Sequence, residues 1–233
     1  MQSPSRVASA ARIAGLFAVG LCALGPLANQ LGLTPAMGGF LTFALGLLLG
    51  LVALVLGLVG LFLGRAGRPA ALTGALLGLV IVAAGIFASA PGRGLPRIND
   101  ITTDPADPPA FADPKRAYPG EEFARLQRAA YSDLAPIRRA EPADAAYRAA
   151  LATARSLGWE IVREDPAAGI FEATETSAVF RFVDDVVVRV RPDSGRARVD
   201  VRSKSRVGQG DLGANAARIR TFASKLGGAP APH

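Results

Sequence analysis

The sequence predicts three transmembrane helices followed by an α+β domain, in which an antiparallel β-meander is packed by a preceding helix and a C-terminal helix. Three observations support this fold class. The first 90 of the 233 residues contain no Asp or Glu and form three long apolar runs. The remainder holds all 19 acidic residues, and its short apolar segments alternate as half-buried strands do. Segments with helical periodicity stand before and after these strands.

The apolar runs are each long enough to cross a bilayer. A hydrocarbon core of about 30 Å requires about 20 mostly apolar residues in a helix. The runs cover residues 13–31, 38–64 and 69–90, and no charge lies inside any of them. Ionisable groups inside the membrane mark ion and proton pathways, so the runs disfavour a channel or a transporter.

Arginines at the ends of the runs predict the orientation. Arg6 and Arg12 precede the first run, Arg65 and Arg68 connect the second to the third, and the loop 32–37 is uncharged. By the positive-inside rule, both arginine groups and the N-terminus are cytoplasmic. We therefore predict a multi-pass protein of the bacterial inner (cytoplasmic) membrane with a periplasmic or extracellular C-terminal domain. The alternative is that the first run is a cleaved signal peptide.

Glycines recur four residues apart in the second and third runs. This spacing lets helix backbones approach closely. It is explained either by packing within a three-helix anchor or by contact with a second copy or another membrane protein. The pairs are Gly46 and Gly50, Gly60 and Gly64, and Gly74 and Gly78.

Residues 91–119 are rich in proline and aspartate and have no periodicity. Such a segment cannot form a helix or a central strand. Its apolar residues Ile98, Ile101, Phe111 and Tyr118 favour an extended arm laid on the domain over a free linker. The predicted organisation is a membrane anchor over 1–90, an arm over 91–119, a soluble domain over 120–227 and a disordered tail over 228–233.

Periodicity predicts the elements of the soluble domain. Helical patterns cover 120–131, 142–157 and 211–226, and the last of these places five apolar residues on one face: Leu212, Ala216, Ile219, Ala223 and Leu226. Strand patterns separated by turn residues cover 135–139, 159–163, 169–176, 179–183, 185–191 and 196–205.

Alternation in the last strand separates an apolar face from a charged face. Ala197, Val199 and Val201 share one face, whereas Arg198, Arg202 and their even-numbered neighbours share the other. One solvated face is the usual state of an antiparallel sheet. The alternative is an anionic partner, such as phospholipid headgroups or a cell-wall polymer. The net charge of +7 would suit nucleic acid, but the predicted external location excludes most such partners.

The stretch Gly208-Gln209-Gly210-Asp211-Leu212-Gly213 fits the glycine pattern of dinucleotide-binding folds. That fingerprint also requires a parallel βαβ unit, and no strand follows this helix, so we reject it. Asp211 instead suits a helix N-cap. Arg206 or Arg218 could pair with Asp211 as a structural clasp, or the corner could bind a ligand. The candidate ligand-binding residues are Arg206, Asp211, Asn215, Arg218 and Arg202, with Asn99, Asp100 and Asp104 on the arm.

Several of these segments carry a resemblance to a known family. They are the arm 97–104 followed by Asp107-Pro108-Pro109, the phrase 182–189, and the long motif 200–208 running into 211–219. Together they resemble the family called domain of unknown function 1499, over roughly 96–226. The resemblance implies a domain without an established activity, often behind membrane segments in proteobacteria and with relatives in plastids. It also implies that the arm belongs with the domain.

The residue inventory favours a binding or scaffold module over an enzyme. The only histidine is His233 and the only cysteine, Cys22, lies in an apolar run, so the usual zinc ligands and histidine or thiolate catalysts are absent. We predict no metal and no cofactor. Asp184 and Asp185 face opposite ways in a strand. The alternatives are an envelope hydrolase that uses Asp carboxylates, or a structural partner of another membrane protein.

Overall fold

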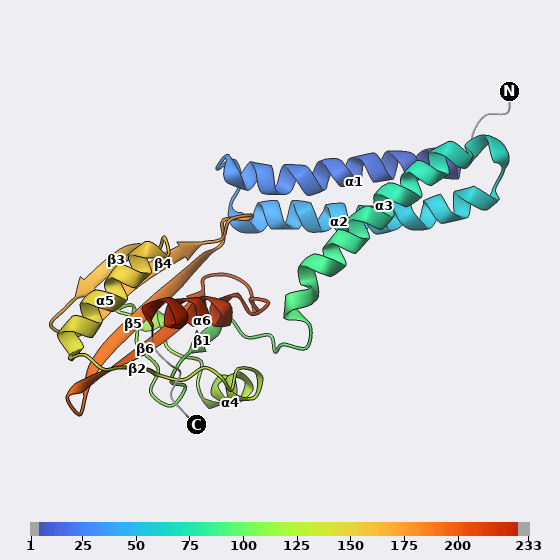
Figure 1. Ribbon diagram of the computed structural model, residues 1–233. Helices are drawn as coiled ribbons and strands as arrows, with labels where there is room; N and C mark the ends of the chain where they lie inside the picture. Colours follow the sequence, from blue (N-terminus) through green and yellow to red (C-terminus); the bar gives the residue numbers. More distant parts are fainter. Residues whose placement is uncertain (1–4, 228–233) are drawn as a thin grey trace. The chain divides into compact units, whose positions relative to one another are not determined.

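The structure is a computed structural model that describes residues 5–227, so the predicted tail 228–233 lies outside the described residues. The chain divides into a first, mainly helical unit, which comprises the chain up to Pro91 together with Ala178–Arg181, and a second unit, which comprises the remainder from Gly92 onward. Three helices, α1 (Arg6–Gln30), α2 (Ala36–Phe62) and α3 (Arg68–Ser89), form the first unit (Figure 1). By length and composition, all three could cross a membrane. The prediction of three long apolar helices is therefore confirmed.

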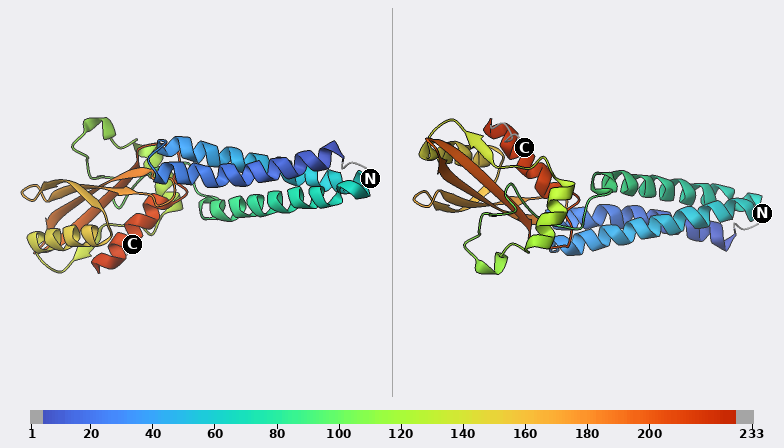
Figure 2. Two further views of the ribbon diagram at one scale, coloured as in Figure 1. Left: turned by 90° about the horizontal axis from the view of Figure 1, so that it is seen from above. Right: turned by 90° about the horizontal axis from the view of Figure 1, so that it is seen from below.

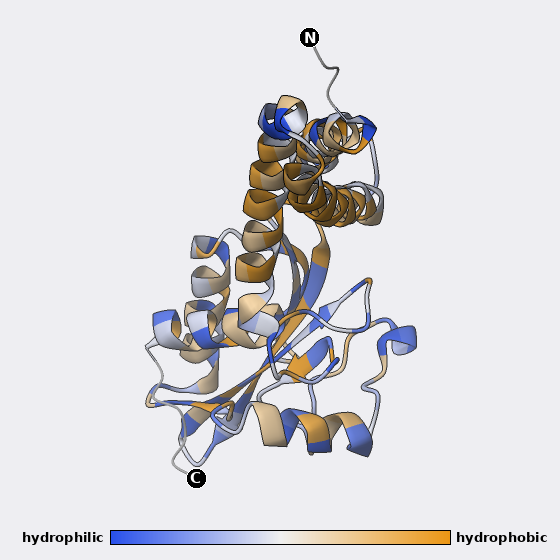
Figure 3. Cartoon of the chain, turned by 90° about the vertical axis from the view of Figure 1, so that its right-hand side faces the viewer, coloured by the Kyte–Doolittle hydropathy of each residue, from blue (hydrophilic) through white to orange (hydrophobic). Residues whose placement is uncertain are grey.

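Small residues line the contacts among these helices, and many of their large apolar residues are exposed. Most of each helix is hydrophobic by residue hydropathy (Figure 3). Gly46 and Gly50 on α2 and Gly74 and Gly78 on α3 are buried. A Cβ atom at Gly78 would lie 2.4 Å from the carbonyl oxygen of Gly50, so only glycine permits this approach. Gly64 lies outside the helices and has open space around it. The four-residue spacing thus serves packing among the three helices.

We expect Gly74→Leu to disrupt this packing. A Cβ at Gly74 would lie 2.5 Å from the backbone carbon of Ala11, and backbone cannot move aside cheaply. The destabilisation should be about 1–3 kcal/mol or more, as for overpacked cores. Thermal stability of the full chain in mild detergent, read by size-exclusion chromatography, would check it. Gly20→Leu is the matched control, because nothing lies within 4 Å of its Cβ position.

The second unit contains an antiparallel sheet of six strands. The spatial order is β1-β6-β5-β4-β3, and β2 pairs with the same edge of β6 as β1 does. Strands β3 to β6 form the predicted meander, which confirms the α+β fold class. The bounds are β1 Asp100–Thr102, β2 Ile137–Arg139, β3 Glu160–Asp165, β4 Ile170–Thr176, β5 Val183–Asp193 and β6 Arg196–Ser205.

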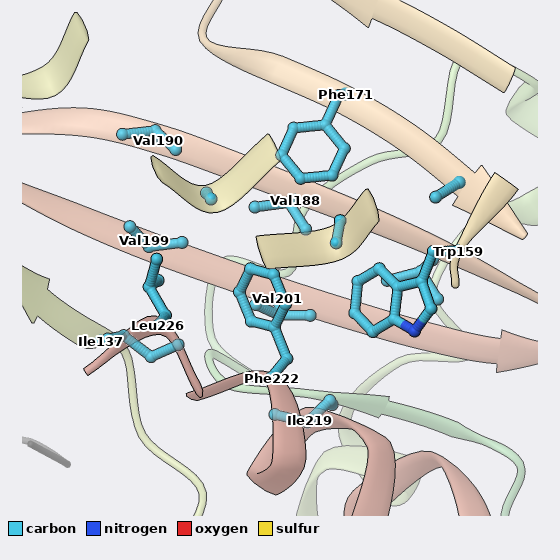
Figure 4. Close-up of a cluster of buried hydrophobic side chains, with 14 of the residues drawn as sticks. Ile137, Trp159, Phe171, Val188, Val190, Val199, Val201, Ile219, Phe222 and Leu226 are labelled. Carbon is cyan, nitrogen blue, oxygen red and sulfur yellow. The ribbon is translucent and has the colours of Figure 1, made fainter. Parts of the chain in front are cut away.

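Helices α5 (Ala143–Ser156) and α6 (Ala214–Leu226) cover one face of the sheet (Figure 2). The hydrophobic core lies between them and the sheet (Figure 4). Trp159 stacks on Phe222 with ring centroids 5.1 Å apart. Trp159 is the only tryptophan of the chain, so its fluorescence reports on this core alone.

The arm is fixed to the outer edge of the sheet. Strand β1 pairs with β6, and Ile98 and Ile101 are fully buried. On the far side of β1, Gln127 of α4 (Glu121–Ala130) accepts a hydrogen bond from the Thr102 amide at 3.0 Å and donates one to its carbonyl oxygen at 2.6 Å. One side chain therefore satisfies an edge position that would otherwise be open to another strand.

Two local predictions are wrong. Residues 179–183 do not form a separate strand, because they lie in a hairpin between β4 and β5 in which Arg181 has a positive φ of 57°. The Ser177 amide donates to the Phe182 carbonyl oxygen at 2.7 Å, and the Phe182 amide donates to the Ser177 hydroxyl at 2.8 Å. Leu212 is not a buried helix residue. It is 61% exposed and has a φ of 54°, because α6 begins only at Ala214.

Candidate functional site

The candidate site lies on the face of the sheet opposite α5 and α6, where the arm residues 103–118 cross β5 and β6 (Figure 2). We call this surface the arm face. The interpretation of this face as a solvated basic strip is wrong for its centre, because Arg202 is 1% exposed and Asp200 is fully buried. Aspartates interleave with the basic residues, and the arm covers them.

Arg202 forms the centre of the arm face. Its guanidinium donates two hydrogen bonds to Asp100, at 2.7 and 2.8 Å, in a bidentate pair. Two further bonds go to the carbonyl oxygens of Pro109, at 3.1 Å, and Arg116, at 2.7 Å. The guanidinium carbon also lies 4.9 Å from the ring centroid of Phe111 and 5.4 Å from that of Tyr118. The Arg202 side chain therefore bonds to the arm at three separate places, Asp100, Pro109 and Arg116.

Three further cations stand beside this centre and are partly exposed. Arg206 forms a bidentate pair with the buried Asp185, at 2.8 and 3.1 Å, and Arg116 contacts the same carboxylate at 3.0 Å. Lys204 donates to Asp100 at 2.9 Å. The side chains of Arg206, Arg116 and Lys204 are 46%, 31% and 24% exposed, so they are oriented by buried carboxylates and still reach solvent.

A hollow of about 420 Å³ opens in the same region. Arg202 and Arg116 contribute cationic side chains to its lining, Asp113 contributes an anionic one, and Phe111 and Tyr118 contribute aromatic walls. Ligand pockets of proteins have roughly this size and this mixture of apolar walls with few charged groups. The hollow therefore has the size of a site for a small ligand.

We expect the phenol of Tyr118 to lose its proton only at unusually high pH. Burial, and then the negative charge of Asp100, raise the pKa of its phenol to about 12. A raised tyrosine pKa adds stability at pH values below the ordinary value of about 10, and that stability is lost as the pH rises toward 12. Ultraviolet absorbance of tyrosinate during alkaline titration would check this. Tyr118→Phe should remove the step with the highest pKa, and denaturant should return that step to about pH 10.

A second polar cluster lies on the opposite, helix-covered face. Asn215 is fully buried, and its side chain links Ser203 at 2.6 Å and Ser205 at 3.0 Å to the carbonyl oxygen of Asn99 at 3.2 Å. Arg218 donates to the same Asn215 oxygen at 2.6 Å. The cluster joins α6, β6 and the start of the arm.

Arg218 also carries the charge of this cluster. It contacts Asp184 at 2.6 Å and pairs with Glu175, and its side chain is only 8% exposed. Asp184 and Asp185 do face opposite ways, since Asp184 meets Arg218 on the helix-covered face and Asp185 meets Arg206 on the arm face. These two adjacent carboxylates cannot act on one substrate.

The structure does not form the expected clasp around Asp211. The predicted N-cap is also wrong, since Gly213 and not Asp211 precedes the first residue of α6. The Asp211 carboxylate accepts hydrogen bonds from the amides of Gly213 at 2.9 Å and Asn215 at 2.8 Å. Neither Arg206 nor Arg218 pairs with it, because register directs them to Asp185 and Asp184.

The eight predicted site residues are therefore divided between the two faces. Asp100 and Arg202 meet on the arm face, and Asp104 pairs with Arg198 there. Asn99 donates to the Gly208 carbonyl oxygen at 2.6 Å and bonds to Asn215 through its own carbonyl.

Sequence reasoning missed the partners of these residues. Asp185, Asp200 and Arg116 complete the arm face, and Glu175 completes the cluster around Arg218. A usable signal was the meander register, which sets Asp185 opposite Lys204 and Arg189 opposite Asp200 on adjacent strands. Contacts with Arg116 depend on the course of the arm, which has no periodicity to reveal it.

Within residues 5–227, no group of three or more His, Cys, Asp or Glu side chains is placed to hold a metal ion. A family profile described as protein of unknown function (DUF1499) matches residues 100–226, which is more than half of the chain. This match confirms the resemblance carried by the arm and by the motif around β6 and α6. No curated protein matches the chain.

Proposed function

The chain belongs to the DUF1499 family of proteins of unknown function, and on this premise we propose that it is a membrane-anchored module whose domain binds a phosphate-bearing component of the cell envelope. In this proposal residues 1–90 form the anchor, 91–119 the arm and 120–227 the binding domain. The ligand is anionic because the accessible side chains of the arm face are predominantly cationic.

The proposal rests on one observation. Two buried carboxylates on the arm face, those of Asp100 and Asp185, hold four cationic side chains: Arg116, Arg202, Lys204 and Arg206. The carboxylates are at most 4% exposed, whereas three of the cations reach solvent. The carboxylates fix the donors in place beforehand, so less conformational freedom is lost on binding. Guanidinium groups match phosphate oxygens in geometry and charge.

The adjacent hollow extends the argument to the neighbouring part of the ligand. Phe111 and Tyr118 offer apolar walls beside Arg116. A glycerol or sugar carbon next to a phosphate could contact such walls. Phospholipid headgroups and phosphate-containing wall polymers share this chemistry.

The arginines at the helix ends support the proposed side of the membrane. Arg6 and Arg12 lie in the first two turns of α1, and Arg65 and Arg68 lie between α2 and α3. With three spans and the positive-inside rule, the domain is outside the cytoplasm, in contact with the envelope.

The test is a binding titration of the full chain held in phosphatidylcholine nanodiscs. One experiment adds soluble poly(glycerol phosphate), and a second experiment replaces part of the nanodisc lipid with phosphatidylglycerol, so that the two sources of phosphate are separated. Calorimetry follows the first experiment, and the phosphorus-31 NMR signal of phosphatidylglycerol follows the second. We expect saturable binding in at least one experiment, and absence of binding in both would contradict the proposal.

The decisive variant is Lys204→Gln/Arg206→Gln. It removes two accessible cations but leaves Asp100 paired with Arg202 and Asp185 paired with Arg116, so the fold should persist. We expect at least a roughly tenfold weaker affinity, which corresponds to about 1.4 kcal/mol. Arg128→Gln/Arg220→Gln removes the same charge from exposed pairs elsewhere and serves as the matched control. Equal weakening in both double variants would show only a general charge effect.

A further inference from the structure

Three arginines converge at the other end of the arm face. Arg189, Arg191 and Arg198 all contact Asp200, with distances of 3.1, 2.8 and 2.8 Å. Asp200 is fully buried. These residues come from β5 and β6 and are distinct from the cations around Asp100 and Asp185.

The arm supplies the remaining negative charges of this group. Asp107 lies between two of the guanidiniums, with Arg191 at 2.6 Å and Arg189 at 3.0 Å from one carboxylate oxygen and Arg189 at 3.3 Å from the other. Asp104 pairs with Arg198. Unlike Asp200, the Asp107 side chain is 55% exposed.

Asp107 balances the positive charge of this group of arginines. Three arginines face three aspartates in this group, so removal of the Asp107 carboxylate would leave a surplus positive charge on Arg189 and Arg191. Within the described part of the chain, the buried Nε of Arg189 has no hydrogen-bond partner. The two guanidiniums thus hold an exposed carboxylate that balances their charge.

We propose that Arg189 and Arg191 form an anion-binding site that Asp107 occupies from within the chain, and that a phosphate or sulfate group binds there by displacing the Asp107 carboxylate. The geometry suits the exchange, since two guanidiniums that converge on carboxylate oxygens can converge on phosphate oxygens equally well. A doubly charged phosphate also places more negative charge between them than one carboxylate does. Hydrogen bonds from Arg191 and then Arg189 lower the pKa of Asp107, so the internal occupant is itself an anion at neutral pH.

The contrast with Asp100 indicates that only this part of the arm can move. Exposed ion pairs contribute little to stability, typically below about 1 kcal/mol. Ala106 and Asp107 are exposed, and they lie between half-buried residues that are flanked by buried Thr103 and buried Pro109. Displacement of Ala106 and Asp107 therefore leaves β1 and the Arg202 centre in place.

Substitution of Asp107 tests this proposal quantitatively. When a site is blocked in some of the molecules, the apparent affinity equals the intrinsic affinity multiplied by the fraction of molecules in which the site is open. Asp107→Asn removes the competing charge but leaves both arginines paired with Asp200, so the domain stays folded. We expect the dissociation constant for inorganic phosphate or sulfate to fall at least roughly tenfold relative to the unmodified chain.

The experiment titrates inorganic phosphate, and separately sulfate, into the full chain in phosphatidylcholine nanodiscs, with the Trp159 emission spectrum confirming the fold of each variant. Asp193→Asn is the matched control, since it removes one carboxylate from the Arg138 pair at the end of β5 and should leave affinity unchanged. Arg191→Gln added to Asp107→Asn should abolish the gain.

Two outcomes would overturn the proposal: an Asp107→Asn chain that binds no more tightly than the unmodified chain, or a gain that survives Arg191→Gln. These two outcomes are independent of the function proposed above. That function is tested by Lys204→Gln/Arg206→Gln, which leaves Arg189, Arg191 and Asp107 unchanged. If the envelope ligand does not bind and Asp107→Asn still increases affinity, only the proposed function fails.

Discussion

Asp100→Asn is expected to lower the free energy of unfolding of the domain by about 3–5 kcal/mol. Asp100 is fully buried and neutralises Arg202, which is 1% exposed. The asparagine leaves a guanidinium in the interior without a counter-charge, and it also removes the partner of Lys204. Loss of one member of a buried pair costs far more than the pair itself contributes, because the remaining charge stays desolvated.

Urea unfolding of the full chain in mild detergent, followed by Trp159 fluorescence, measures this change. Asp113→Asn is the matched control. It lies on the same arm, is 46% exposed, and stands 3.7 Å from Arg116, so its loss should cost less than about 1 kcal/mol. Similar midpoints for the two variants would show that the Asp100–Arg202 pair does not hold the arm.

Arg218→Met is expected to destabilise the domain by a similar amount, about 3–5 kcal/mol. The methionine leaves Asp184 buried without its cation and deprives Asn215 and Ser203 of a shared donor. Because these groups link α6 to β5 and β6, the helix should loosen where it begins.

The matched control for this variant lies on the same helix. Arg220 is 45% exposed and pairs with the exposed Asp133, so Arg220→Met should cost no more than about 1 kcal/mol. Trp159 stacks on Phe222 of α6 and reports both variants directly. If Arg218→Met unfolds at the same urea concentration as Arg220→Met, the cluster around Arg218 is not a structural clasp.

The periodic parts of the fold could be predicted from the sequence. Apolar length identified α1 to α3, and alternation identified the last strand with its observed bounds, Arg196–Ser205. Each of these elements has a repeating pattern set by burial of one face or of all faces. Alternation also separated Asp184 from Asp185 correctly.

The pairing of side chains could not be predicted in the same way. Arg206 meets Asp185 and not Asp211, because strand register and the late start of α6 decide which charges adjoin. Cover of the arm face by residues 103–118 depends on contacts such as Phe111 on Arg202, between residues far apart in the chain. A charged strand face therefore looked solvated although its centre is buried.

The proposed function requires the domain to lie outside the cytoplasm, and labelling of a single cysteine tests this most directly. Cys22 is the only cysteine, so Cys22→Ser removes the native thiol and Ser132→Cys places one on the exposed surface of the domain. A maleimide of a size that passes the outer membrane but not the inner membrane is added to intact bacterial cells that produce this variant. The account predicts full labelling before lysis, and labelling only after lysis would contradict it.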